Sequence, residues 1–155
     1  MGAAENAVTK AEYEFFVPGV PAPGGSKRHI GHGRIIEDCK RTPAWRSVVA
    51  LSAMQAGCVP LEGALSLHVT FMMPRPKGHM RKDGTLKPSA PKHPIVKPDT
   101  TKLMRALEDA LTGICWRDDT QVVIQAAHKA YAAVTCGAFV RISQLDSIDK
   151  EISNG

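Results

Sequence analysis

The sequence predicts an α+β fold in which a mixed sheet of about four strands packs with two main helices. Four segments carry the apolar patterns of strands, and two segments repeat apolar residues at the three- and four-residue spacing of helices. With 155 residues, 43% of them hydrophobic and 23% charged, the chain has the composition of an ordinary soluble globular protein. We therefore expect a single domain over residues 1–155, long enough to bury a real core.

The N-terminal part is expected to hold one strand followed by a basic loop. Residues 1–10 have the character of a loose leader, and residues 12–17 alternate apolar and polar side chains as a strand does. Residues 18–33 are rich in proline and glycine and run into a basic end. Backbone amides and cations of such a loop can grip phosphate groups, whereas the alternative is a mobile surface loop that is merely basic. The cations of this end are Lys27, Arg28, His29, His32 and Arg34.

A first helix is predicted from Thr42 to Gly57. Threonine can cap a helix N-terminus, and Pro43 fits a first turn because its missing N–H would have no partner there. We expect Trp45 to belong to the core face of this helix rather than to stack on a nucleic-acid base.

Three further strands are expected. Residues 65–72 alternate strictly, and His68 falls on the polar face, so we expect it to be solvated and place it outside the site. Residues 121–131 and 137–145 also have strand character, and the last of these strands is expected to be covered on both faces. Residues 146–155 form a polar tail that we expect to be frayed.

Residues 74–97 form a long basic loop. Structureless loops of more than about 12–15 residues are usually functional or disordered. Its prolines and cations suggest a flexible arm that wraps DNA and orders on binding, while the alternative is a solvated insertion. Its candidate DNA contacts are Arg75, Lys77, Arg81, Lys82, Lys92 and Lys97.

The most informative stretch is residues 97–123, where a second helix stands between two acidic positions. Asp99 precedes the helix, Thr100 or Thr101 can cap it, and Gly113 can end it. Asp118-Asp119 follows in a tight turn before the next strand. If that strand packs back along the helix, as short connections favour, the acidic side chains converge. The apolar stripe of the helix consists of Leu103, Ala106, Leu107, Ala110 and Leu111.

Acidic residues around a basic helix suit metal-dependent phosphodiester chemistry. Mg²⁺ usually takes one or two carboxylates together with substrate phosphates, and it can activate water for an in-line attack. Asp99 and Asp119 could hold the ion, and Arg105 could neutralise phosphate charge. Each residue also has a plainer interpretation: Asp99 as a helix cap, the aspartate pair as a turn, and Arg105 as the partner of Asp109.

The same stretch resembles the signature of the RusA family of Holliday junction resolvases, the crossover junction endodeoxyribonucleases. The resemblance implies a small, usually phage-borne, Mg²⁺-dependent endonuclease (Mn²⁺ could substitute) that acts as a homodimer on four-way DNA junctions in recombination and repair. It also implies a location in the cytoplasm of a bacterial or phage-infected cell. The matching residues are Pro98-Asp99, Leu103, Arg105-Ala106, Asp109 to Gly113, Trp116, Asp118-Asp119 and Gln121-Val122.

Position by position, the resemblance makes Asp99 and Asp119 metal-binding aspartates, with Asp118 beside them as a further candidate ligand. Arg105 falls where the family has a catalytic lysine; it keeps the charge, but guanidinium does not act as an acid near neutral pH. Lys102 falls where asparagine is expected and places a second cation beside the site. The catalytic set implied is therefore Asp99, Asp119, Arg105 and Lys102.

The sequence departs from the family pattern at Thr101, where a second aspartate is expected. The hydroxyl of Thr101, Asp109 or Asp118 could compensate for the lost carboxylate. Otherwise the protein is a catalytically weakened module that binds junction or duplex DNA. A net charge of +5 favours an anionic partner, although a basic accessory protein with a protein partner remains a third possibility.

Nothing in the sequence suggests a membrane or an oxidising compartment. No apolar run reaches the roughly 18 residues that a membrane span needs. The four cysteines are widely scattered without a C-x-x-C pair, so we expect reduced thiols.

Overall fold

The computed structural model describes residues 12–25, 27–29, 35–37 and 39–145. The expected leader and the expected frayed tail lie outside the described residues, as do His32 and Arg34 of the basic loop. No helix within the described ranges is long and apolar enough to cross a membrane.

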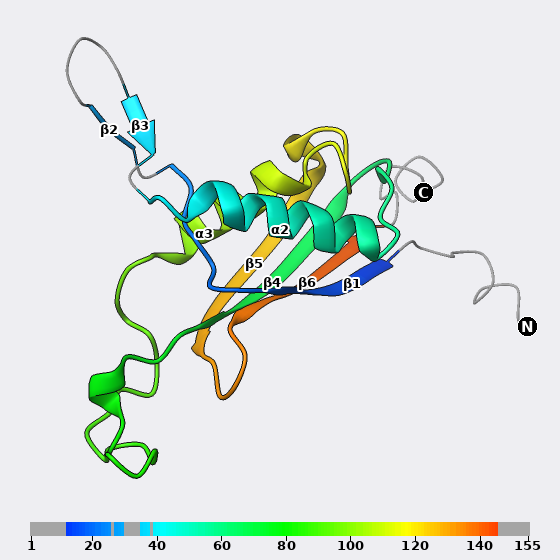
Figure 1. Ribbon diagram of the computed structural model, residues 1–155. Helices are drawn as coiled ribbons and strands as arrows, with labels where there is room; N and C mark the ends of the chain where they lie inside the picture. The colour runs from blue at the N-terminus through cyan, green and yellow to red at the C-terminus, as the bar shows by residue number, and fades with distance from the viewer. Residues whose placement is uncertain (1–11, 26, 30–34, 38, 146–155) are drawn as a thin grey trace, which may run out of the picture.

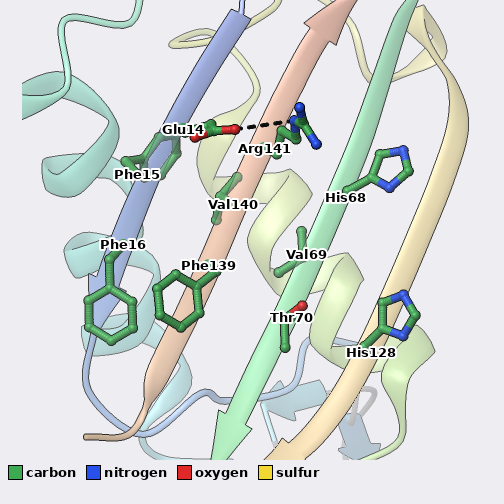
Figure 2. A pocket seen from close by; sticks show the side chains of 10 residues that line it. All are labelled: Glu14, Phe15, Phe16, His68, Val69, Thr70, His128, Phe139, Val140 and Arg141. Carbon is green, nitrogen blue, oxygen red and sulfur yellow. Dashed lines mark ion pairs between the residues drawn. The ribbon is translucent and has the colours of Figure 1, made fainter.

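Four strands form a mixed sheet in the order β1-β6-β4-β5. β4 runs parallel to β5, and β6 lies antiparallel to both β1 and β4. Two helices cover one face of this sheet. Within the described residues no helix covers the other face, which we call the open face (Figures 1 and 2). The predicted α+β class is therefore confirmed. The elements are β1 (Glu12–Pro18), α2 (Thr42–Gln55), β4 (Leu65–Met73), α3 (Thr100–Leu111), β5 (Val122–Tyr131) and β6 (Gly137–Gln144), with a small pair of strands, β2 (Lys27–His29) and β3 (Ile35–Glu37).

The core lies between the sheet and the two helices. The alternation predicted for β4 is confirmed, because its apolar set is buried while His68 is exposed. The last strand, β6, is not covered on both faces as expected. Val140 and Ile142 stand two residues apart and so share the buried face, whereas Phe139 is 56% exposed on the open face. The buried set of β4 is Leu65, Leu67, Val69, Phe71 and Met73.

Helix α2 begins differently from the prediction. Arg41 occupies the N-cap position, and no side chain caps the helix there. Thr42 is fully buried and its hydroxyl donates a 2.6 Å hydrogen bond to the carbonyl of Pro23. The threonine thus fixes the proline-glycine loop against the helix instead of capping it. Trp45 is only 3% exposed, as expected of a core residue.

The basic loop of residues 74–97 has more structure than the sequence suggested. It contains a short 3-10 helix, η1 (Lys77–His79), and a bridge between Met80 and Leu86. The amide of Arg81 donates a 2.7 Å bond to the carbonyl of Thr85. The expectation of a segment without structure of its own was therefore wrong. We call this segment the arm; it projects beyond the end of the sheet (Figure 1).

The proline-glycine loop lies directly on α3. The amide of Gly24 donates a 2.8 Å bond to the carbonyl of Lys102. A Cβ atom on Gly24 would stand 3.0 Å from the backbone nitrogen of Ala106. Gly25 has a positive φ of +80°, and a Cβ there would meet the guanidinium of Arg105. Glycine is needed at Gly24 because the loop touches the helix backbone there, and it is favoured at Gly25 because of the positive φ.

We expect Gly24→Ala to lower the free energy of unfolding by about 1–3 kcal/mol, because the added methyl group presses on helix backbone that cannot move aside. Denaturant unfolding measures this change. Gly78→Ala is the matched control, since a Cβ there meets nothing within 4 Å, and its effect should stay within about 0.5 kcal/mol. Equal effects of the two substitutions would contradict the proposed backbone contact.

Candidate active site

Asp99 stands at the start of α3 and caps it. Its carboxylate accepts a 3.1 Å hydrogen bond from the amide of Lys102, and the Lys102 ammonium lies 3.8 Å from the other carboxylate oxygen. The prediction that Thr100 or Thr101 caps the helix was therefore wrong. Aspartate is at least as good a cap as threonine, and its negative charge also suits the positive end of the helix dipole. The Asp99 side chain is 55% exposed, so it remains open to a ligand from solvent.

Asp118 is used within its own turn. It precedes a short 3-10 helix, η2 (Asp119–Gln121), and its carboxylate accepts bonds from the amide and the hydroxyl of Thr120, at 2.9 and 2.8 Å. These bonds, the amide first, hold the pKa of Asp118 below its usual value. Of the two neighbouring aspartates, Asp118 is thus the one whose carboxylate shapes the turn.

The side chain of Gln121 locks this turn to the rest of the molecule. Its carbonyl oxygen accepts bonds from the amides of Arg117 and Asp118, at 2.9 and 3.1 Å. Its NH₂ group donates to the carbonyls of Leu61 and Gly63, at 2.8 and 3.0 Å. One amide side chain therefore joins the aspartate turn to the segment before β4. The sequence analysis noted Gln121 only as part of a motif, since its distant partners have no local signal.

Asp119 faces α3 across a hollow of about 250 Å³. The hollow brings Asp119 together with Arg105 and Thr101 of α3, whereas the sequence analysis expected the aspartates of the turn to converge with Asp99. Asp99 and Lys102 pair with each other at the beginning of the helix and do not line the hollow. Its lining residues are Thr101, Met104, Arg105, Glu108, Asp109, Asp119 and Gln125.

Glu108 is an acidic member of this hollow that the sequence analysis missed. It is half-buried, and its carboxylate is hydrogen-bonded by the side chain of Gln125. Burial raises the pKa of Glu108, the Gln125 bond opposes this, and the negative charges of Asp119 and Asp109 raise the pKa further. A signal did exist, because Thr101, Arg105 and Glu108 are spaced to share one face of a helix.

Asp109 has a different partner from the one considered. Its carboxylate forms a 3.2 Å ion pair with Arg46 of α2. This contact joins the two helices and draws Asp109 away from an i,i+4 pairing with Arg105. Of the three groups that could replace the expected second aspartate, Asp118 is engaged in its turn, Asp109 lines the hollow but is paired with Arg46, and Thr101 lines the hollow.

The donor chemistry of the site suits a hard cation only in part. Within the described ranges no group of three or more His, Cys, Asp or Glu residues is placed to hold a metal ion. Carboxylate oxygens of Asp119 and Glu108 do face one hollow, and Mg²⁺ commonly uses one or two carboxylates and completes its shell with water and substrate phosphate. The residues therefore fit an ion that binds together with its substrate.

The candidate DNA contacts divide into structural and exposed groups. The Arg75 guanidinium lies 4.0 Å from the centre of the Tyr131 ring and donates a 2.7 Å bond to the carbonyl of Pro91, so it holds the arm. Lys97 lines a second hollow, of about 210 Å³, together with Lys129. Lys27 and Arg28 belong to β2. The other candidate contacts of the arm, all exposed, are Lys77, Arg81, Lys82 and Lys92.

A third hollow, of about 540 Å³, lies on the open face of the sheet and contains none of the candidate residues. Figure 2 shows the rings of Phe16 and Phe139 side by side, 4.8 Å apart, with His68 and His128 on the two neighbouring strands. This surface lies on the other side of the sheet from α3 and therefore from the acidic hollow.

We expect Gln121→Ala to destabilise the fold by about 1–3 kcal/mol, because four backbone groups lose their partner. Thermal unfolding followed by circular dichroism measures the loss. Gln55→Ala, at the exposed end of α2, is the control and should change stability little. A change no larger than that of the control would show that the amide does not hold the turn.

The raised pKa of Glu108 predicts a dependence of stability on pH. The folded protein holds this proton more tightly than the unfolded chain, so Glu108 costs stability as pH rises from its unfolded value near 4.5 through the raised value. In EDTA, Glu108→Gln should therefore be more stable than the wild type at neutral pH and equal to it in acid. Denaturant midpoints at the two pH values test this, and a less stable variant at neutral pH would contradict it.

Comparison with known proteins identifies the family. The family model for the endodeoxyribonuclease RusA matches residues 18–143, which include both helices, the aspartate turn, the arm and most of the sheet. None of the curated proteins compared with the chain matches it. The matched region covers well over half of the chain and contains every residue of the acidic hollow. The chain therefore belongs to the RusA family of endodeoxyribonucleases, whose activity is the resolution of Holliday junctions.

Proposed function

We propose that this protein is a Mg²⁺-dependent, structure-selective endonuclease that resolves Holliday junctions by hydrolysing phosphodiester bonds. The observation that carries the proposal is the hollow in which Asp119, Arg105 and Glu108 meet, beside an α3 that begins at Asp99. Acidic and basic groups on one exposed helix face match the needs of phosphodiester cleavage, where both a cation and a phosphate must be held.

Asp99 and Asp119 are the proposed metal ligands, with Mn²⁺ as an alternative ion. The bound ion would lower the pKa of an attacking water and stabilise charge on the phosphate. Arg105, which lines the hollow, and Lys102, which lies beside Asp99, would bind the non-bridging phosphate oxygens. Asp118, engaged with Thr120, is better suited to shape the turn than to bind the ion directly.

Glu108 supports an active enzyme in spite of the substitution at Thr101. The expected second aspartate is missing from the start of α3, but a carboxylate two helical turns later shares the hollow with Asp119. Glu108 thereby supplies a second carboxylate beside Asp119. This favours retained cleavage over a weakened, purely DNA-binding protein.

The substrate and the assembly follow from the same proposal. A four-way junction has two-fold symmetry, so a homodimer with C2 symmetry would place one site at each of two strands. The exposed cations of the arm, together with Lys27 and Arg28 of the basic loop, would contact the phosphate backbone. Such an enzyme would work in the cytoplasm of a bacterial or phage-infected cell, in DNA recombination and repair.

Cleavage of a synthetic four-way junction and of a matched linear duplex, in Mg²⁺ and in EDTA, tests the proposal. We expect symmetric nicks on the junction only with Mg²⁺. Loss of a residue that only orients a metal ligand typically costs roughly 10–100-fold in activity. Asp99→Asn and Asp119→Asn remove proposed ligands themselves, so each should slow cleavage by more than that, while junction affinity in EDTA is retained.

Two further variants sharpen this test. Glu108→Gln should also slow cleavage if it replaces the missing aspartate. Glu14→Gln, an exposed acid on the open face of the sheet, is the control and should cut like the wild type. Junction binding without nicks by the wild type would instead support the weakened DNA-binding protein, and undiminished cutting by both aspartate variants would reject the site.

A further inference from the structure

The ammonium group of Lys129, on β5, is bonded to the backbone just before α3. It donates a 2.8 Å hydrogen bond to the carbonyl of Val96 and a 2.9 Å bond to the carbonyl of Pro98. Pro98 immediately precedes Asp99, the N-cap of α3. Lys129 therefore holds the last residues of the arm at the point where the chain turns into the helix.

The same end of β5 holds the beginning of the arm. Tyr131 lies under the guanidinium of Arg75 at 4.0 Å, and the ring of His79 meets it edge-on with the ring centres 5.6 Å apart. The amide of Ala132 donates a 2.8 Å bond to the carbonyl of Met73. Both ends of the arm are thus fastened to the last residues of one strand.

From these contacts we propose that Lys129 is a positioning residue for the cleavage reaction. It acts by fixing Asp99 and the arm relative to Asp119, and it does not itself touch the substrate. This inference rests on the proposed nuclease function. Asp119 lies just before β5 begins, so β5 positions this proposed ligand directly. Lys129 lies within β5 and holds the carbonyl groups of Val96 and Pro98, so β5 also positions Asp99, the residue that follows Pro98.

The competing role for Lys129 is direct contact with a DNA phosphate. Two of the three ammonium protons are already directed at carbonyl oxygens, which leaves one for any other partner. Carbonyl groups do not neutralise the charge, however, so the two roles must be separated by experiment. They differ in what a replacement side chain has to supply: hydrogen-bond donors for positioning, and positive charge for phosphate contact.

The experiment compares Lys129→Met, Lys129→Gln and Lys129→Arg with the wild type. Three quantities are measured: the single-turnover cleavage rate at saturating junction, the junction Kd in EDTA as a function of salt, and the affinity for Mn²⁺ by calorimetry. Melting temperatures establish that each variant is folded. Lys40→Met, which removes an exposed lysine at the turn before α2, controls for the loss of one positive charge.

Positioning predicts that Lys129→Met lowers the single-turnover rate by about 10–100-fold, as expected for a group that orients a metal ligand. The junction Kd and its salt dependence should resemble those of Lys40→Met, and Mn²⁺ affinity should fall. Lys129→Gln should recover much of the rate, because an uncharged amide can still donate to a carbonyl.

Several outcomes would overturn the inference. One is a wild-type rate in Lys129→Met. Another is weaker junction binding with a salt slope lower by about one, restored by Lys129→Arg but not by Lys129→Gln, which would make Lys129 a phosphate contact. A different result would reject the proposed function: a wild-type protein that binds junctions without cutting them. In that case the Mn²⁺ affinity of Lys129→Met still tests the positioning role of Lys129. An unchanged affinity would reject that role, and a lowered affinity would support it.

Discussion

The burial of one side of α3 against the sheet is the constraint on which the rest of the structure depends. Leu103, Leu107 and Leu111 are fully buried, so the helix cannot rotate without exposing them to water. That burial fixes the direction of the opposite side, which presents Arg105 and Glu108 to the aspartate turn. The same 12-residue helix thus contributes to the core and to the acidic hollow. A substitution that moves the helix in the core would therefore also move Arg105 and Glu108 in the hollow.

Strand β5 is the second organising element, because it connects features that are far apart in the sequence. The aspartate turn leads into it, Gln125 on it reaches Glu108, and Lys129 and Tyr131 near its end hold the arm. Its parallel pairing with β4 places all of these beside the strand from which the arm departs. The acidic hollow and both ends of the arm therefore share one rigid support.

Local patterns in the sequence were sufficient to predict most of the fold. The alternation in β4 and the apolar stripe of α3 depend only on neighbouring residues, and both are found. Side-chain roles were harder, because they depend on distant partners. From the sequence Thr42 resembles a helix cap, but in the structure its hydroxyl donates a hydrogen bond to the carbonyl of Pro23. Asp109 is spaced to pair with Arg105, but its ion pair is with Arg46. The sequence already places Glu108 on one helix face with Thr101 and Arg105, but only folding brings Asp119 opposite to it.

The position of β6 has a consequence for how the molecule is made. It is the last of the described strands along the chain, yet it lies inside the sheet, between β1 and β4. It pairs Glu12 with Ser143, across almost the whole described sequence. During synthesis on the ribosome, β1 and β4 must wait for it, because they have no direct pairing with each other. Such long-range closure slows folding and leaves apolar strand surface exposed meanwhile. The nascent chain therefore completes its sheet only after β6 has emerged.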